Sequence, residues 1–360
     1  MRVRRPRRTR GAALLLVLWV FMVLGVLALD FARYMRDDAR AALNFVEETR
    51  GYYVAVAAMN RAVWDAMRLR DQGPASGAED DDGEGGADSG RLAGMRDDDI
   101  MPADGQWREG VFGDARYQIR ITDEGGRIAI NRAPEAVLRR VVTNLLVGGA
   151  VQGMGRQEAA RIDGIVDAVL DWRDTDNLER MHGAESEFYL NGPGGYPAKN
   201  GFLDAPEELL LVRGITAELF YGHDGVPGLR DIVSVFNRSG RLNARTVTPA
   251  VLQALLAIGP EEAAELIAER TGSPEAFLAR LQAQLATIDP TLSDLLTDEP
   301  ASTVLVEARA DTREERNQAR VAAVFELGTD DFDGPRVRRW FDRAPWEGAL
   351  PSGAGRDNGA

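Results

Sequence analysis

The N-terminal segment constrains the whole chain, because it holds eighteen consecutive residues without a charged side chain, Ala12 to Leu29. A helix rises about 1.5 Å per residue, so this run is roughly 27 Å long and can cross a membrane once. Six arginines and no acidic residue precede it. Since basic flanks stay on the cytoplasmic side, we expect the N-terminus to be cytoplasmic and the bulk of the chain to be exported.

The junction between the arginines and the apolar run is compatible with two kinds of processing. A cleavable secretory signal needs small residues after its apolar core, and the sequence at 30–34 is a poor site of that kind. Gly11, in contrast, stands directly before the apolar run, as in the type III signals of pilins and pseudopilins. In those proteins a prepilin peptidase cuts after the glycine and methylates the new N-terminus. We therefore expect cleavage between Gly11 and Ala12.

The helical pattern continues beyond the membrane segment. Apolar and small residues recur in steps of four and three, at Met35, Ala39, Ala42, Val46, Thr49, Tyr53, Val56, Asn60, Val63 and Met67. This spacing predicts one helix from residue 12 to about 70, roughly 88 Å long. We expect its second half to pack this stripe on a soluble domain and to bind partner proteins through Val46, Tyr53 and Val56.

Composition excludes several classes of function. The formal charge of −14 and the pI near 4.8 argue against a nucleic-acid surface, which needs a basic face. Cysteine is absent, so thiol chemistry and cysteine-bound zinc are excluded, and only two histidines are present. No serine lies in a nucleophile motif, which argues against an exported hydrolase. We therefore expect a protein that is not an enzyme.

Four segments predict β-structure. Arg116–Ile121 alternates polar and apolar residues, and Arg127–Asn131 is the expected returning strand of a hairpin. Thr303–Arg309 and Arg320–Leu327 form a second predicted pair near the C-terminus. Because an isolated hairpin is marginal in water, we expect both pairs to join one antiparallel sheet on the long helix. The chain between the two pairs is then an insertion.

An acidic, glycine-rich stretch separates the long helix from the first strand. The run at 77–90 has no apolar residue larger than alanine, which predicts a mobile loop over about 71–110. Calcium is the alternative reading of so many acids, but a calcium loop needs a repeated pattern of oxygen ligands. No such repeat is visible.

The insertion is predicted to be almost wholly helical. A weak repeat relates 126–138 to 240–252, and each copy places a proline near the first turn of a helix. A third helical unit at 205–220 carries the pattern Leu-Val-x-Gly-Ile, which resembles a helix-hairpin-helix, a fold often used to hold DNA backbones. Glutamates surround its turn, so a compact module for protein contacts is the favoured interpretation.

The densest group of carboxylates follows the helix predicted to end near Asp171. Calcium accepts six to eight oxygen ligands in loose geometry. We expect the ligands to be Asp174, Asp176, Glu185 and Asn200, within a cluster that also holds Asp171 and Glu187. The alternative is that cations nearby in the sequence neutralise these acids in surface salt bridges, namely Arg173, Arg180 and Lys199.

The order of motifs resembles a known family. Asp171-Trp-Arg-Asp-x-Asp, Gly183-Ala-Glu, Tyr196-x-Ala-Lys-Asn-Gly and Glu207-Glu-Leu-x-x-Val-x-Gly-Ile-Thr follow a glycine-cut anchor. This arrangement is similar to the minor pseudopilin K family of type II secretion systems, over most of the chain from Gly11 to about Leu327. The acidic loop and the sequence after Trp340 depart from the common pattern.

The resemblance implies a fold, a place and a set of partners. It implies a pilin-like core with a large inserted α-domain that binds calcium, in a protein anchored in the inner membrane with its bulk in the periplasm. The partners would be minor pseudopilins I and J and the major pseudopilin, at the tip of a fibre that exports folded proteins. Most pilin-like subunits carry a glutamate at the fifth mature position, where this chain has Leu16.

We therefore predict an α+β protein that initiates or caps a pseudopilus and binds no nucleic acid. The alternative is an anchored periplasmic helix-hairpin-helix protein that handles incoming DNA, as in competence machinery. The expected parts are a cleaved leader at 1–11, a helix at 12–70 with its membrane part at 12–29, an acidic loop at 71–110, a sheet at 111–131 and 301–330, an all-α insertion of the SAM or helix-hairpin-helix type at 132–300, and a disordered extension at 331–360.

Overall fold

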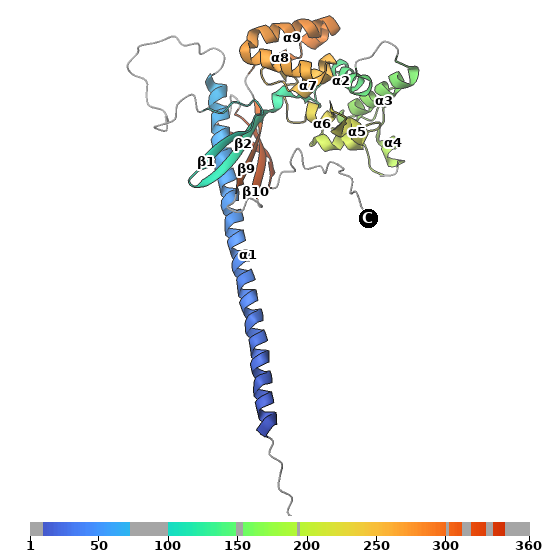
Figure 1. The fold of residues 1–360 in the computed structure, drawn as a ribbon. Coiled ribbons are helices and arrows are strands. Elements are labelled where there is room, and N and C mark those ends of the chain that lie inside the picture. The colour runs from blue at the N-terminus through green and yellow to red at the C-terminus, as the bar shows by residue number, and fades with distance from the viewer. Residues whose placement is uncertain are drawn as a thin grey trace, which may run out of the picture.

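The computed structural model describes residues 10–72, 100–148, 154–192, 195–299, 302–311, 318–328 and 334–342. Within them lie a long helix, a five-stranded sheet and a helical insertion. Figure 1 shows the insertion beside the C-terminal end of the helix, while the N-terminal half of the helix extends away on its own. The predicted α+β architecture with a long N-terminal helix is confirmed.

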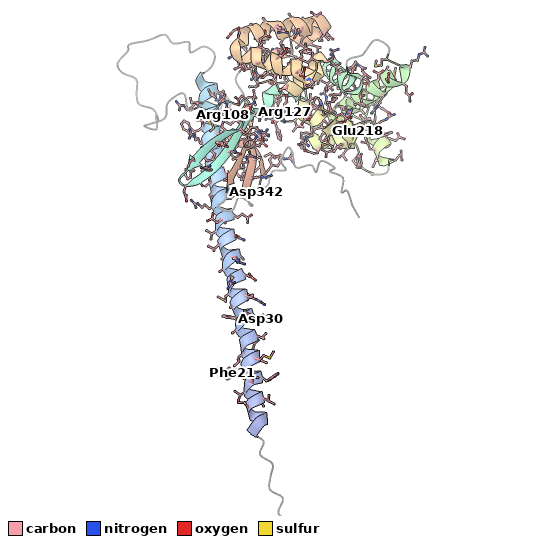
Figure 2. All side chains as sticks on the ribbon, viewed as in Figure 1. Phe21, Asp30, Arg108, Arg127, Glu218 and Asp342 are labelled. Carbon is pink, nitrogen blue, oxygen red and sulfur yellow. The ribbon has the colours of Figure 1, made fainter. Side chains whose placement is uncertain are left out.

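Helix α1 spans Arg10–Gln72 without a break. All its residues from Leu14 to Val46 are exposed, and Figure 2 shows Phe21 and Asp30 pointing into open space. Burial starts at Gly51 and follows one face of the helix, in steps of three and four, through Val54, Ala55, Ala58, Met59, Ala62, Val63 and Ala66. This face packs on the sheet and forms a core with strand residues such as Ile119 and Val306.

The packing face of α1 is rotated from the stripe expected from the sequence. Val46 and Tyr53 are 59% and 65% exposed, and Val56 is half-buried, whereas Val63 from the same stripe is buried. Alanines dominate the true face because a helix that lies close on a sheet needs small residues at the contact.

The sheet has the order β1-β2-β9-β10-β11, and all neighbours are antiparallel. Its strands are β1 Arg108–Phe112, β2 Ala115–Asp123, β9 Thr303–Asp311, β10 Gln318–Glu326 and β11 Arg336–Phe341. Alternate residues of β2, β9 and β10 face α1, as period-two alternation requires. The predicted pairing of the two C-terminal segments is confirmed by the β9–β10 register.

The predicted hairpin between 116–121 and 127–131 is wrong. Strand β2 instead pairs with β1 and β9, and β3, Ile128–Ala129, pairs in parallel with β6, Val233–Ser234, inside the insertion. The hydrogen bonds of Asp123 explain why the chain leaves the sheet after β2. Its buried carboxylate accepts hydrogen bonds from the backbone N–H of Gly125 at 2.7 Å and from the side chains of Asn243 and Thr246 at 2.8 and 2.6 Å. The end of β2 is thereby fixed to the insertion.

Two strands lie where loop or tail was expected. Strand β1 begins within the predicted loop 71–110, and the structure already places Asp104 in a bridge with Thr122. Strand β11 lies within the predicted disordered extension 331–360 and pairs with β10. Three of its six residues are arginines, so the sequence did not predict a strand here. Charged side chains are nevertheless tolerated in a strand at the edge of a sheet. The remainder of both predictions, 73–99, 331–333 and 343–360, lies outside the described residues, as do residues 1–9 of the leader.

The insertion has its own hydrophobic core, separate from that of the sheet. The helices α2 and α7 start at the repeated prolines, with Pro134 as the N-cap of α2 and Pro249 in the first turn of α7. Its elements are α2 Glu135–Val147, α3 Arg156–Arg173, α4 Ser186–Leu190, η3 Pro206–Leu211, α5 Ala217–Tyr221, β4 Gly222–His223, β5 Val226–Pro227, α6 Leu229–Ile232, β7 Leu242–Asn243, α7 Pro249–Leu256, α8 Pro260–Gly272, α9 Pro274–Ile288, α10 Pro290–Ser293 and β8 Leu296–Thr297.

Candidate functional site

A cluster of carboxylates forms where α3 ends. Asp171 lies in the last turn of α3, Asp174 is the C-cap residue, and Glu185 is the N-cap residue of α4 after an eleven-residue return of the chain at 174–184. One carboxylate oxygen from each of these residues lies within 4.8 Å of the other two. Asp171 and Glu185 are buried, while Asp174 is partly exposed. Three acidic groups therefore converge on one point at the surface of the insertion.

Several oxygens at this point have no hydrogen-bond donor. Oδ1 of Asp171, both carboxylate oxygens of Glu185 and Oδ1 of Asn200 are buried without a hydrogen bond in the described part of the chain. A buried polar atom that lacks a partner costs free energy, so native proteins satisfy almost all of them. Three of these acceptors, from Asp171 and Glu185, belong to the carboxylate cluster, and buried acceptors without donors at one place fit a cation site, since a metal ion binds to acceptor atoms.

The ionisation of the cluster shows the same need for positive charge. Burial raises the pKa of the Asp171 carboxyl from 3.8 to about 6, despite the backbone N–H groups of Arg180 and Ala184, which donate to its Oδ2 at 3.2 and 2.9 Å. Burial and the charges of Asp171 and Asp174 also raise the pKa of Glu185. Both carboxyls are thus difficult to ionise in the metal-free protein.

The alternative of neutralisation by surface salt bridges finds little support. Arg173 donates to the backbone carbonyls of Ile130 and Ala133 at 2.5 and 2.8 Å, and Lys199 pairs with Asp204 and Glu208 at 2.6 and 2.8 Å.

Among the described residues, Arg180 is the one of these three cations that forms an ion pair with the cluster. Its Nε lies 3.6 Å from Oδ1 of Asp171, and its Nη1 lies 3.4 Å from Glu135. One half-exposed guanidinium beside three carboxylates leaves the cluster negative.

Gly183 makes the close approach of the loop to Asp171 possible. A Cβ atom at this position would lie 1.8 Å from Oδ2 of Asp171, the oxygen that accepts the two backbone hydrogen bonds. Only glycine therefore lets the loop close over this carboxylate. The Gly-Ala-Glu motif of the sequence supplies this space, the donor N–H of Ala184 and the carboxylate of Glu185 in three successive residues.

An aromatic cluster packs around the end of α3, next to the carboxylates. The ring of Tyr189 lies 5.1 Å from that of Trp172 and stacks on Tyr196 at 5.6 Å. Its hydroxyl accepts a hydrogen bond from the backbone N–H of Arg213, and burial raises the Tyr189 pKa to about 12. Trp172 follows Asp171 directly, so this packing fixes the end of α3 that carries the carboxylates.

The structure brings together some of the predicted ligands but not all of them. Asp174 and Glu185 meet in the cluster, whereas the carboxylate of Asp176 lies outside it and accepts the backbone N–H of Leu178 at 2.8 Å. Asn200 donates its amide to the carbonyl of Asp176 and to Oδ1 of Asn177. Its own buried Oδ1 is one of the acceptors without a donor.

Asp171 is the residue that the predicted ligand set missed. Asp171 belongs to the acidic cluster that the sequence predicts but not to the predicted ligands. Its i, i+3 spacing to Asp174 was the available signal, since residues three apart share one helix face.

The N-terminal half of α1 is a second functional feature. It is the one described helix long and apolar enough to cross a membrane, which supports a single membrane anchor. The expected processing site, Gly11 and Ala12, falls in the first turn of this helix. The expected partner residues lie farther along α1, where Val46 and Tyr53 are exposed and Val56 is half-buried. The structure thus leaves most of this predicted contact surface accessible.

Comparisons with known proteins agree with this architecture. The family model of type II secretion system protein K matches residues 127–222, which include the carboxylate cluster. The fold is similar to a chain in the crystal structure of the GspK-GspI-GspJ complex from enterotoxigenic Escherichia coli, with a TM-score of 0.50 and 18% identity over 67% of this chain and 84% of that chain. No curated protein matches the sequence. The matched domain and the similar fold both agree with the resemblance of the sequence to minor pseudopilin K.

Proposed function

We propose that this protein occupies the tip of a pseudopilus, where it initiates or caps fibre assembly for the export of folded proteins. The position of the insertion carries the proposal. Figure 1 shows it at the end of α1 that is remote from the membrane segment, and it extends sideways past the sheet. A subunit stacked above this one would meet the insertion, whereas the exposed length of α1 from Leu14 to Val46 leaves room for subunits below.

The N-terminal sequence supports membrane anchoring in one orientation. The arginines before Gly11 keep the leader in the cytoplasm, and the sheet and the insertion then lie in the periplasm. Prepilin peptidase cleaves after Gly11 and the new N-terminus at Ala12 is methylated. Leu16, at the fifth mature position, provides no carboxylate to neutralise the amine of a neighbouring subunit. A subunit with nothing stacked above it does not need one.

Minor pseudopilins I and J are the proposed direct partners, and the major pseudopilin follows below them. The similar fold occurs in a complex of GspK with GspI and GspJ, which supports this choice. The contact surface comprises Val46, Tyr53 and Val56, on the part of α1 next to the sheet. Large exposed apolar side chains of this kind favour protein contacts.

Calcium is the proposed ligand of the carboxylate cluster. Asp171, Asp174 and Glu185 provide the converging carboxylates, and Asn200 provides an amide oxygen. Hard oxygen donors of mixed type fit calcium better than zinc. The ion has a structural role: it compensates the charge of the cluster and holds the loop at 174–184 against the end of α3.

The tip position is tested by locating the protein on purified fibres. An epitope on the insertion, labelled with gold, should appear at one end of each fibre and in about one copy. Leu16→Glu is the companion variant, and we expect it to leave fibre number unchanged or only slightly reduced. Regular labelling along the fibres would contradict the placement.

A further inference from the structure

The turn between β1 and β2 presents an exposed aromatic side chain beside α1. The two strands form a hairpin in which Phe112 pairs with Ala115, and Phe112 is 60% exposed. Figure 1 shows that the turn of this hairpin is directed toward the membrane segment of α1. Arg50 of α1 forms an ion pair with Asp114 in the turn. The end of the hairpin is therefore held next to the point where α1 leaves the sheet, since burial of the helix starts at Gly51.

The register of the hairpin places Phe112 on the face of the sheet that carries α1. Residues paired across two strands share a face, and successive residues of one strand point to opposite faces. Ala115, the partner of Phe112, packs on the core beneath α1, as Tyr117 in the same strand does. Val111 pairs with Arg116 and belongs to the opposite face. Phe112 thus points to the side of α1, whereas Val111, which is 67% exposed, points away from it.

The helix covers this face of the sheet only in part. It lies over β2, β9 and β10, whose inward residues form a core with its own. Among the described residues, strand β1 contributes none to that core, and its side chains are exposed or half-buried. The strip of sheet on the β1 side of α1 is therefore open, and Phe112 lies at its membrane end.

The flank of α1 next to the hairpin turn carries two more large apolar side chains. Leu43 and Val46 precede Arg50 by seven and four residues, so all three lie on one side of the helix. Because Arg50 contacts Asp114, this is the side that faces the hairpin. Leu43 is 64% exposed and Val46 is 59% exposed. Together with Phe112 they form one apolar surface, the α1–β1 corner.

We propose that the α1–β1 corner binds the N-terminal helix of a partner subunit that is anchored in the same membrane. The proposal rests on the proposed tip function and extends its contact surface from α1 to the edge of the sheet. A stable interface needs about 800 Å² on each partner, which the few exposed side chains of one helix do not provide.

A helix is the occupant that the arrangement favours. A partner that rises from the same membrane meets the exposed part of α1, Leu14–Val46, before it reaches the sheet. A helix that follows α1 along this length continues directly into the corner. There it would cover the open strip of sheet beside β1, in the same way that α1 covers β2 and β9.

Two substitutions in the hairpin test the proposal in the full-length protein, co-expressed in the membrane with minor pseudopilins I and J. Phe112→Asp places a carboxylate in the corner, and Val111→Asp is the matched control on the opposite face. Val46→Asp tests the helical contact surface of the proposed function. We expect Phe112→Asp to lower the recovery of a partner about tenfold, as loss of a central interface contact does. Val111→Asp should leave the recovery unchanged.

The outcomes separate this proposal from the proposed function. If Val46→Asp prevents recovery and Phe112→Asp does not, the corner is refuted while the helical surface stands. If none of the three variants has an effect, both are refuted. Equal losses in Phe112→Asp and Val111→Asp would also overturn the corner, because the face of the sheet would then be irrelevant. All variants should melt at the wild-type temperature, since the three side chains are exposed.

Photo-crosslinking identifies the occupant without relying on a destabilising variant. The crosslinking amino acid p-benzoylphenylalanine replaces Phe112 in one protein and Val111 in the other. Mass spectrometry should find the product at position 112 joined to the N-terminal helix of a partner, in the part that follows its membrane segment. Position 111 should give no such product. A product between position 112 and a partner's strand, as expected for a strand added to β1, or a second copy of this chain, would overturn the proposal.

Discussion

Replacing Asp171 by asparagine should change the free energy of unfolding in opposite directions in the metal-free and the calcium-bound protein. In the metal-free protein the folded state holds a buried carboxylate whose pKa is raised from 3.8 to about 6. A shift of about two pKa units corresponds to roughly 3 kcal/mol, since each unit is about 1.4 kcal/mol. At pH 7 the wild-type carboxylate therefore lowers the free energy of unfolding by an amount of this order.

The geometry allows asparagine to replace this carboxylate without strain. Its side-chain oxygen can accept the backbone N–H groups of Arg180 and Ala184, as Oδ2 of Asp171 does. Its amide nitrogen then takes the place of Oδ1 and faces the carboxylates of Asp174 and Glu185 as a donor. Asp171→Asn should thus stabilise the protein in EDTA at pH 7, by up to about 3 kcal/mol.

Calcium should invert this order. A ligand that binds only the folded state stabilises it by about 4 kcal/mol at a thousandfold excess over its Kd. The variant loses a charged ligand, so it should gain much less than wild type. The assay is chemical unfolding of both proteins in EDTA and in millimolar calcium, with Glu187→Gln as a control, because Glu187 is exposed and lies outside the cluster.

The pH dependence gives a second readout of the same reasoning. Because the folded pKa lies above the unfolded value, the contribution of Asp171 is favourable below about pH 4 and is lost as the pH rises through about 6. Wild type in EDTA should show this loss and Asp171→Asn should not. The reasoning is refuted if Asp171→Asn is destabilised equally in EDTA and in calcium, since the carboxylate would then be held by protein contacts alone.

Three further predictions concern other parts of the chain. Gly183→Ala should destabilise the insertion by about 2 kcal/mol or more and abolish calcium uptake in a calorimetric titration, because the new Cβ atom would overlap the Asp171 carboxylate. Gly11→Val should leave full-length protein in the membrane, and mass spectrometry of the wild type should show an N-methylated Ala12; an N-terminus after Leu29 would contradict this. Val46→Asp or Tyr53→Asp should prevent co-purification with minor pseudopilins I and J while the melting temperature stays unchanged, because both side chains are exposed in the free protein.

Features that depend on local sequence could be predicted well. The uncharged run from Ala12 and the helical spacing after it predicted α1 within two residues at each end. The second predicted pair of strands, 303–309 and 320–327, corresponds to β9 and β10, which pair with each other as expected. The same holds for the acidic cluster, where the end of one helix and the start of the next place Asp174 and Glu185 close together.

Features that depend on distant partners could not be predicted. The segment at 127–131 has the composition of a strand, but the hydrogen bonds of Asp123 with Asn243 and Thr246 direct it into the insertion. Strand β11 is recognisable only once β10 provides an edge for it to pair with. Asp171 is likewise buried because the loop at 174–184 folds back and places Gly183 against its carboxylate. No local sequence pattern predicts this contact.

The separation of the two hydrophobic cores has a consequence for how calcium can act. The carboxylate cluster belongs to the insertion, whose core shares no residue with the core beneath α1. The exposed residue Val46 lies on α1 before its buried face begins at Gly51, and Tyr53 lies on the exposed side of the helix just beyond that point. If the cluster binds calcium as proposed, loss of the ion should act first on the loop at 174–184 and should leave the membrane anchor and the helical contact surface intact. Calcium would then control what the insertion presents at the end of the fibre, while entry of the subunit into the membrane stays independent of calcium.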